Sequence, residues 1–146
     1  MNDYEIEEAE SKKIKFENTK VLEKFEAYLK SKNLSVNTIE KHSNNVSFFI
    51  NEFLQYEEPL RPNEGIDRVD YFLGNWFIRK AMWSSVSAIK ENITSLKHFY
   101  SFLNNIGEID SAQLSELNEN IKENKNDWFE ASQRYDDPDA DLDDEW

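Results

Sequence analysis

Apolar residues recur every three or four positions along most of the chain, and no stretch alternates between apolar and polar residues as a strand would. This spacing predicts five helices. The first is expected to begin at a cap supplied by Asn18 or Thr19 and to end near Lys32, before a turn formed by the residues SKNLS. The apolar side of this helix consists of Val21, Leu22, Phe25, Tyr28 and Leu29.

The second predicted helix begins after a cap at Ser35 and ends near Tyr56, before the proline-containing loop EEPLRPNEG. Its expected buried face consists of Ile39, His42, Val46, Phe49, Ile50 and Phe53. Phe48 falls on the polar side of this helix. We therefore expect another segment, such as the fifth helix, or a partner to cover the Phe48 ring.

A third helix is predicted from about Ile66 to Lys80, although Gly74 within it costs ~1 kcal/mol relative to alanine. Its apolar residues are Val69, Phe72, Leu73 and either Trp76 or Phe77. The fourth helix is expected to begin after the Ser84-Ser85 pair and to stop at Gly107, because glycine suits the left-handed conformation that ends helices. Its buried residues should be Ile89, Ile93, Leu96, Phe99, Tyr100 and Leu103.

The fifth helix is expected to start at Asp110 or Ser111 and to present only a narrow apolar stripe, which predicts an arm packed across the bundle or against a partner. The stripe consists of Leu114, Leu117, Ile121 and Trp128. From Arg134 the sequence RYDDPDADLDDEW is dominated by mutually repelling acids and predicts a disordered tail. The expected organisation is a charged N-terminal extension (1–17), a helical domain (18–107), an arm (108–133) and an acidic tail (134–146).

The formal net charge of -13 is concentrated at the two ends of the chain. Residues 20–107 carry a net charge of +1, residues 1–19 carry -3, and residues 108–146 carry -11. The central domain is therefore nearly neutral, and the acidity of the whole protein says little about what the surfaces of this domain bind.

Several classes of function are disfavoured by the composition. The charged first residues lack the apolar run of a signal peptide, and no stretch approaches the ~20 apolar residues of a membrane span, so we expect a soluble cytoplasmic protein without a membrane partner. The three glycines are isolated, which excludes a glycine-rich phosphate loop, and motifs for a nucleophile elbow or a metalloprotease are absent. We expect no catalytic residue, no cofactor and no small-molecule substrate.

A metal site is not expected either. The chain has no cysteine and only two histidines. His42 lies on an apolar stripe and is interpreted as a packed histidine with one hydrogen bond. His98 projects beside Lys97, and a surface or DNA-facing role for it is the less favoured interpretation. The acidic run DDPDADLDDE lacks the glycine and the final glutamate of a calcium-binding loop, so we interpret it as a solvated tail.

Polar residues form stripes opposite the apolar faces of two predicted helices. On the fourth helix they are Ser87, Lys90, Thr94, Lys97 and Ser101, and on the second they are Asn37, Lys41 and Asn44. Ammonium, amide and hydroxyl groups of this kind bind phosphates and base edges of nucleic acids. The alternative is that these stripes are the ordinary outer faces of a soluble bundle.

The chain also resembles the N-terminal core-binding, or SAM-like, domain of the tyrosine recombinase (phage integrase) family over about ninety residues. The matching residues are Phe25-x-x-Tyr28-Leu29, Leu34-Ser35-x-x-Thr38-Ile39, Val46-x-x-Phe49, Ile93-Thr94-Ser95-Leu96-Lys97-x-Phe99-Tyr100-x-Phe102-Leu103 and Gly107. The resemblance implies an all-α fold, a four-helix orthogonal bundle of the SAM-like type, extended here by a C-terminal helix and a disordered acidic tail.

In that family the domain is one half of a clamp around duplex DNA. The resemblance implies DNA-facing positions at Asn37, Thr38, Lys41, Asn44, Ser84, Ser85, Ser87, Lys90, Thr94 and Lys97. The family often has an aromatic residue where His42 stands and an arginine where Lys97 stands, and lysine lacks the planar fork of arginine. The catalytic half of the family, with its His-x-x-Arg motif and tyrosine nucleophile, has no counterpart in this sequence, so strand cleavage is not expected.

Three functions fit these observations. The first is a non-catalytic module, accessory or regulatory in DNA recombination or integration, that binds duplex DNA weakly and in a salt-dependent manner. The second is a protein-interaction module that kept the fold, lost DNA binding and recognises a recombinase or another basic protein. The third is an acidic DNA mimic, which needs acids fixed on a rigid surface. The sequence fits either a complete gene product or part of a longer recombinase.

Overall fold

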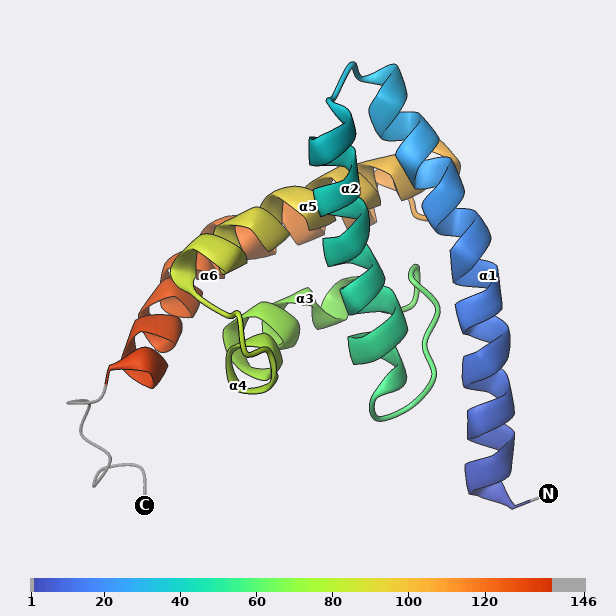
Figure 1. The fold of residues 1–146 in the computed structure, drawn as a ribbon, viewed down its shortest axis with the longest axis horizontal. Helices are drawn as coiled ribbons and strands as arrows, with labels where there is room; N and C mark the ends of the chain where they lie inside the picture. The colour runs from blue at the N-terminus through green and yellow to red at the C-terminus, as the bar shows by residue number, and fades with distance from the viewer. Residues whose placement is uncertain (1, 138–146) are drawn as a thin grey trace.

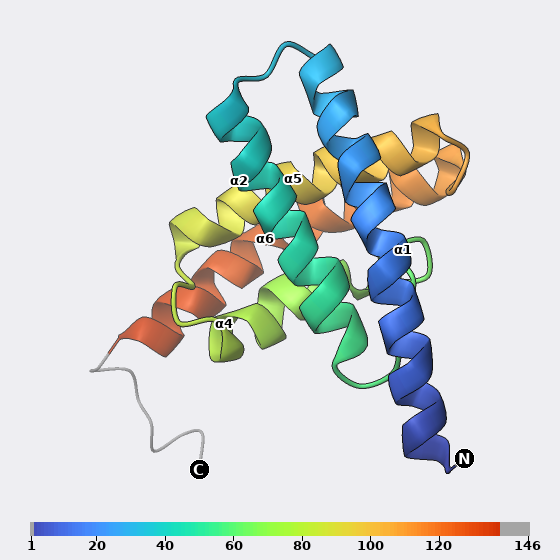
Figure 2. The ribbon, with the colours of Figure 1, turned by 45° about the vertical axis from the view of Figure 1, so that its right-hand side comes forward.

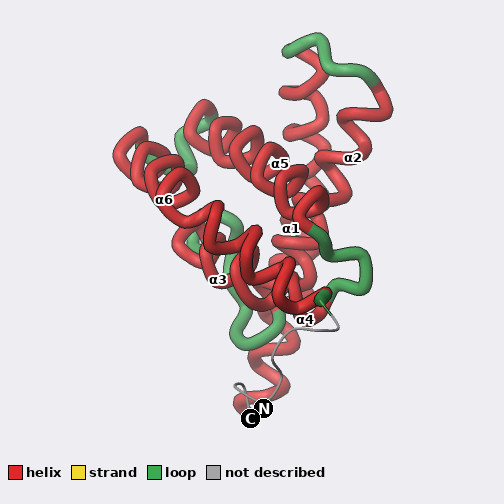
Figure 3. The backbone as a smooth tube through the Cα atoms, turned by 90° about the vertical axis from the view of Figure 1, so that its left-hand side faces the viewer, coloured by secondary structure: helices red, strands yellow, loops and turns green. Residues whose placement is uncertain are grey.

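The computed structural model describes residues 2–137, which form helices and no strand. The expectation of an all-α protein is therefore confirmed for this part of the chain. The α-helices are α1 (Asp3–Ser31), α2 (Val36–Ser47), α3 (Val69–Tyr71), α4 (Phe77–Lys80), α5 (Val86–Asn105) and α6 (Ser111–Asp136). Helices α1 and α2 form an antiparallel hairpin that crosses α5 (Figures 1 and 2). Figure 3 shows α5 between α2 and α6, and α5 packs against both.

Two helical segments of the chain contain π-helical and 3-10 turns in addition to regular α-helix. After α2 the chain continues through a wide π-helical turn at Phe48–Glu52 and a 3-10 turn at Phe53–Gln55, so the expected end near Tyr56 is confirmed to within one residue. Ile66–Arg68 form a 3-10 turn that leads into α3, and a second π-helical turn at Phe72–Trp76 joins α3 to α4. The helical segment predicted from Ile66 to Lys80 is therefore present, with an irregular middle.

The starts of α2, α5 and α6 and the end of α5 are found where expected. Ser35 and Ser85 each accept a hydrogen bond from a backbone N–H in the first turn of their helix. Asp110 and Gln113 form a reciprocal capping box at the start of α6. Gly107 follows α5 with a φ of 82°, the left-handed conformation that favours glycine.

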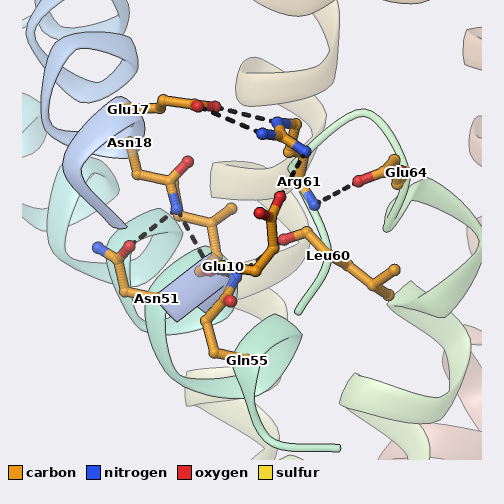
Figure 4. Close-up of polar contacts among 9 residues, drawn as sticks. Glu10, Glu17, Asn18, Asn51, Gln55, Leu60, Arg61 and Glu64 are labelled. Carbon is orange, nitrogen blue, oxygen red and sulfur yellow. Dashed lines mark hydrogen bonds and ion pairs between the residues drawn. The ribbon is translucent and has the colours of Figure 1, made fainter. Parts of the chain in front are cut away.

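The first helix begins much earlier than expected. It starts at Asp3 behind an N-cap at Asn2, and the proposed cap Asn18 is buried in its middle. The Asn18 amide donates hydrogen bonds to the Asn51 side chain at 2.8 Å and to the Ile50 carbonyl at 3.4 Å (Figure 4). A capping residue and a buried amide look alike in sequence, and the partners that distinguish them lie more than thirty positions away.

The N-terminal half of α1 is attached to the loop between α2 and α3 by Arg61. This guanidinium forms ion pairs with Glu10 at 3.2 Å and with Glu17 at 3.0 Å, while the Arg61 backbone N–H donates to Glu64 at 2.8 Å (Figure 4). The hydrogen bond from Arg61 lowers the pKa of Glu17. Residues 1–17, expected to be a separate extension, therefore contribute most of their length to a helix that contacts the domain.

Ten of the 26 buried hydrophobic residues within the described part of the chain are aromatic. Tyr100 is fully buried, which raises the pKa of its hydroxyl, and the hydroxyl donates a hydrogen bond to the Pro62 carbonyl at 2.8 Å. Phe48 is half-buried. Its ring is within 6.2 Å, centroid to centroid, of four rings from the segment after α3 and the loop before α5, which are Phe72, Trp76, Phe77 and Trp83. The expectation that another segment covers Phe48 is thus confirmed, but the cover is not α6.

The C-terminal helix packs against the domain along its narrow apolar stripe. Leu117, Ile121 and Trp128 are buried, and the Trp128 indole donates a hydrogen bond to Asp70 at 2.7 Å. A Cβ added at Gly74 would lie 2.7 Å from the Trp128 ring, so glycine permits the close approach of α6. Helix α6 extends through Asp136 and includes the first residues of the expected disordered tail. The tail beyond residue 137 lies outside the described residues.

Candidate nucleic-acid interface

The outward row of α2 consists of exposed polar side chains. Asn37, Lys41 and Asn44 are exposed, as their spacing opposite the buried face predicts. Thr38 is half-buried and its hydroxyl accepts a hydrogen bond from the Ser35 hydroxyl at 2.9 Å. The α2 row therefore presents two amides and one ammonium group, and Thr38 serves the helix cap.

The outward row of α5 is the longer of the two. Ser87, Lys90, Thr94 and Lys97 are exposed and Ser101 is half-buried. The Thr94 hydroxyl donates to the Lys90 carbonyl at 3.3 Å, so its proton is used within the helix and its oxygen can still act as an acceptor. Because α5 is a regular α-helix of 20 residues, it fixes the spacing of these groups.

Ser84 and Ser85 do not belong to either row. Both are half-buried. The Ser84 hydroxyl donates to the Ile78 carbonyl at 3.2 Å, and the Ser85 hydroxyl accepts from the Ala88 backbone N–H at 3.0 Å. Both hydroxyls stabilise the start of α5. This structural role explains the two serines without a role in binding a ligand.

The two rows meet where α2 crosses α5. Lys41, in the outward row of α2, forms an ion pair at 3.2 Å with Glu91, the neighbour of Lys90 on α5. Beneath this pair the Ser95 hydroxyl contacts His42 Nδ1 at 2.6 Å and accepts a hydrogen bond from Asn45 at 3.0 Å. These contacts join the two helices at the crossing and place Lys41 of the α2 row against Glu91, the neighbour of Lys90 in the α5 row.

His42 and His98 form a ring pair beside this crossing. Their ring centroids are 5.1 Å apart. Burial, followed by the proximity of His98, lowers the pKa of His42, and burial, followed by the charge of Lys32, lowers the pKa of His98. His42 is thus a packed histidine with a hydrogen bond, as expected. His98 is half-buried against it and is not part of the outward row of α5.

The histidine pair predicts a stability that depends on pH. The two histidines have lower pKa values in the folded protein than in the unfolded chain, so the unfolded chain binds more protons as the pH falls. The free energy of unfolding therefore keeps its full value above about pH 6.5, the ordinary histidine pKa, and decreases as the pH falls through the lower pKa values of the folded protein. Urea unfolding of the wild type should give a lower free energy at pH 5.5 than at pH 7.5. The dependence should be shallower in His98→Gln, and equal dependence in the two proteins would contradict this assignment.

Helix α6 borders the α5 row without covering it. Lys97 and Ser101 line an open groove between α5 and α6, and the Lys90 ammonium lies 5.3 Å from the centre of the Phe129 ring. Two further lysines of α6, Lys122 and Lys125, line the same groove. They were not among the residues expected at the site. Only the alignment of α6 beside α5, which the sequence does not specify, brings them there.

Within residues 2–137 no group of three or more histidines and acids is arranged to hold a metal ion. None of the described helices is both long and apolar enough to span a bilayer.

Comparison of the chain with protein-family models, with curated proteins and with solved structures found no match.

Proposed function

We propose that this chain is a non-catalytic duplex-DNA-binding module whose residues 18–107 form a SAM-like bundle of the recombinase core-binding type, with an accessory or regulatory role in DNA recombination or integration. The observation that supports the proposal is the meeting of two exposed polar rows at the Lys41–Glu91 contact. A row on each of two crossed helices suits the curved surface of a duplex better than a row on one helix alone.

The chemistry of the two rows favours binding to the phosphate backbone. Lys41, Lys90 and Lys97 provide point charges for phosphates, and Asn37 and Asn44 provide amides that bond to phosphates or base edges. Glu91 offsets part of the charge of Lys41. Lysine lacks the bidentate geometry with which arginine recognises guanine, so the proposed binding is weak and has little dependence on sequence.

The salt dependence of binding tests this proposal. Fluorescence anisotropy of a labelled 20-base-pair duplex, titrated with the full chain between 25 and 150 mM salt, should give a log affinity that falls with log salt. The three lysines of the two rows predict a slope of about -2.7, and any further phosphate contact makes the slope steeper. Absence of binding at 25 mM salt with ~100 µM protein, a concentration that covers typical non-specific affinities, would overturn the proposal.

A protein-interaction module remains the second proposed function. It is favoured by the loop before α5, where Met82 is 99% and Trp83 57% exposed, because exposed large apolar side chains cluster at protein interfaces. The proposed partner is a recombinase or another basic protein. If this function is correct, the duplex titration gives no binding. The immobilised chain should then capture a purified basic recombinase, and the double variant Met82→Ser/Trp83→Ser should not.

A further inference from the structure

The groove between α5 and α6 collects positive charge on a protein that is acidic overall. Three lysines line it, Lys97 from α5 and Lys122 and Lys125 from α6, against a single acid, Glu119. The remaining polar lining is uncharged and consists of Ser101, Ser111, Ser115 and Asn118. A net positive groove on a chain of net charge -13 indicates a surface suited to an anion.

The three groove lysines are not engaged in direct ion pairs within the described part of the chain. Within the described residues Lys97, Lys122 and Lys125 form no ion pair. By contrast, Arg61 pairs with Glu10 and Glu17 elsewhere on the molecule. The charge of the groove lysines is therefore available to a ligand, whereas the charge of Arg61 is used within the fold.

The two α6 lysines are held by a well-anchored helix. Lys122 and Lys125 are three residues apart, on neighbouring turns, so their side chains lie on one side of α6. The buried residues Ile121 and Trp128 and the capping box at Asp110 fix α6 against the domain. The backbone positions of these lysines are consequently fixed relative to the outward row of α5.

We infer that Lys122 and Lys125 bind the phosphate backbone of the same duplex that the α2 and α5 rows contact, so that α6 is a third DNA-binding element. The inference rests on the proposed function. Packed helices lie about 8–10 Å apart, and one DNA strand carries a phosphate for every ~3.4 Å of helix axis. A strand that follows the α5–α6 groove is therefore close to lysines from both walls.

The test compares two double variants that remove the same charge. Lys122→Gln/Lys125→Gln removes the groove lysines of α6, and the control Lys20→Gln/Lys24→Gln removes two exposed lysines of α1, which does not line the groove. Loss of two phosphate contacts should make the slope of log affinity against log salt shallower by about 1.8 and lower the affinity roughly fiftyfold at 100 mM salt. The control should bind like the wild type.

The outcomes separate this inference from the proposal on which it rests. If the wild type binds the duplex and the Lys122→Gln/Lys125→Gln protein keeps the same slope and affinity, only the role of α6 is overturned. If both double variants lose affinity equally, the effect is one of overall charge and the role of α6 is again overturned. If the wild type itself does not bind, the proposed function fails, and the role of α6 fails with it. Urea unfolding of each variant verifies that the fold is retained.

Discussion

Trp128→Ala is expected to lower the free energy of unfolding by about 3–5 kcal/mol, the usual cost of removing a buried aromatic side chain. Trp128 is 2% exposed, packs onto Gly74 and donates a hydrogen bond to Asp70 at 2.7 Å. Such a loss is a large part of the 5–15 kcal/mol that stabilises a typical domain. Urea denaturation followed by circular dichroism measures it.

The matched control for this variant is Tyr135→Ala, which removes an aromatic residue from the same helix at a position that is 59% exposed. Its free energy of unfolding should stay within about 0.5 kcal/mol of the wild type. If α6 were an arm that melts independently, Trp128→Ala would leave the main transition unchanged. A change below about 1 kcal/mol would therefore contradict the docking of α6, in view of the usual cost for a buried tryptophan.

Removal of residues 134–146 is expected to raise the affinity for duplex DNA about tenfold at 50 mM salt, because a tethered acidic segment competes with phosphate at a millimolar effective concentration. The truncation changes the formal net charge from -13 to -7. The segment is attached to the end of α6, where the Phe129 ring lies 5.3 Å from the Lys90 ammonium of the α5 row. The advantage of the truncated protein should shrink as salt is added, because salt screens both competitors.

A full-length variant distinguishes charge from chain length. Replacing the five acids beyond residue 137 by their amides keeps the tail but removes most of its charge, and this protein should bind DNA nearly as well as the truncated one. The replaced residues are Asp139, Asp141, Asp143, Asp144 and Glu145. Equal affinities for wild type, truncation and amide variant at 50 mM salt would show that the tail does not compete for the lysines.

Local sequence signals were sufficient for most helices but not for the first. Ser35, Ser85 and the Asp110–Gln113 pair mark helix starts because a cap depends on residues within one turn. Asn18 has the same side chain as a cap, yet it is buried against Asn51. Distinguishing the two roles requires knowledge of how α1 and α2 pack, and this is not encoded within a few residues of Asn18.

The same distinction applies to the candidate interface. The outward positions of Asn37, Lys41, Lys90 and Lys97 follow from helical periodicity alone, since each lies opposite an apolar face. Periodicity does not specify which helices are neighbours. The contribution of Lys122 and the internal use of the Ser84 hydroxyl both depend on tertiary contacts.

The length of α1 implies a gradient of local stability along a single helix. Its first turns, from Asp3 to Ala9, are exposed on all sides, and a helical segment this short is marginal in water without packing. Contacts with the rest of the molecule begin at Glu10 and include the buried Ile14. Backbone amides ahead of Glu10 should therefore exchange with solvent by fraying, whereas those after Ile14 require a larger opening of the domain.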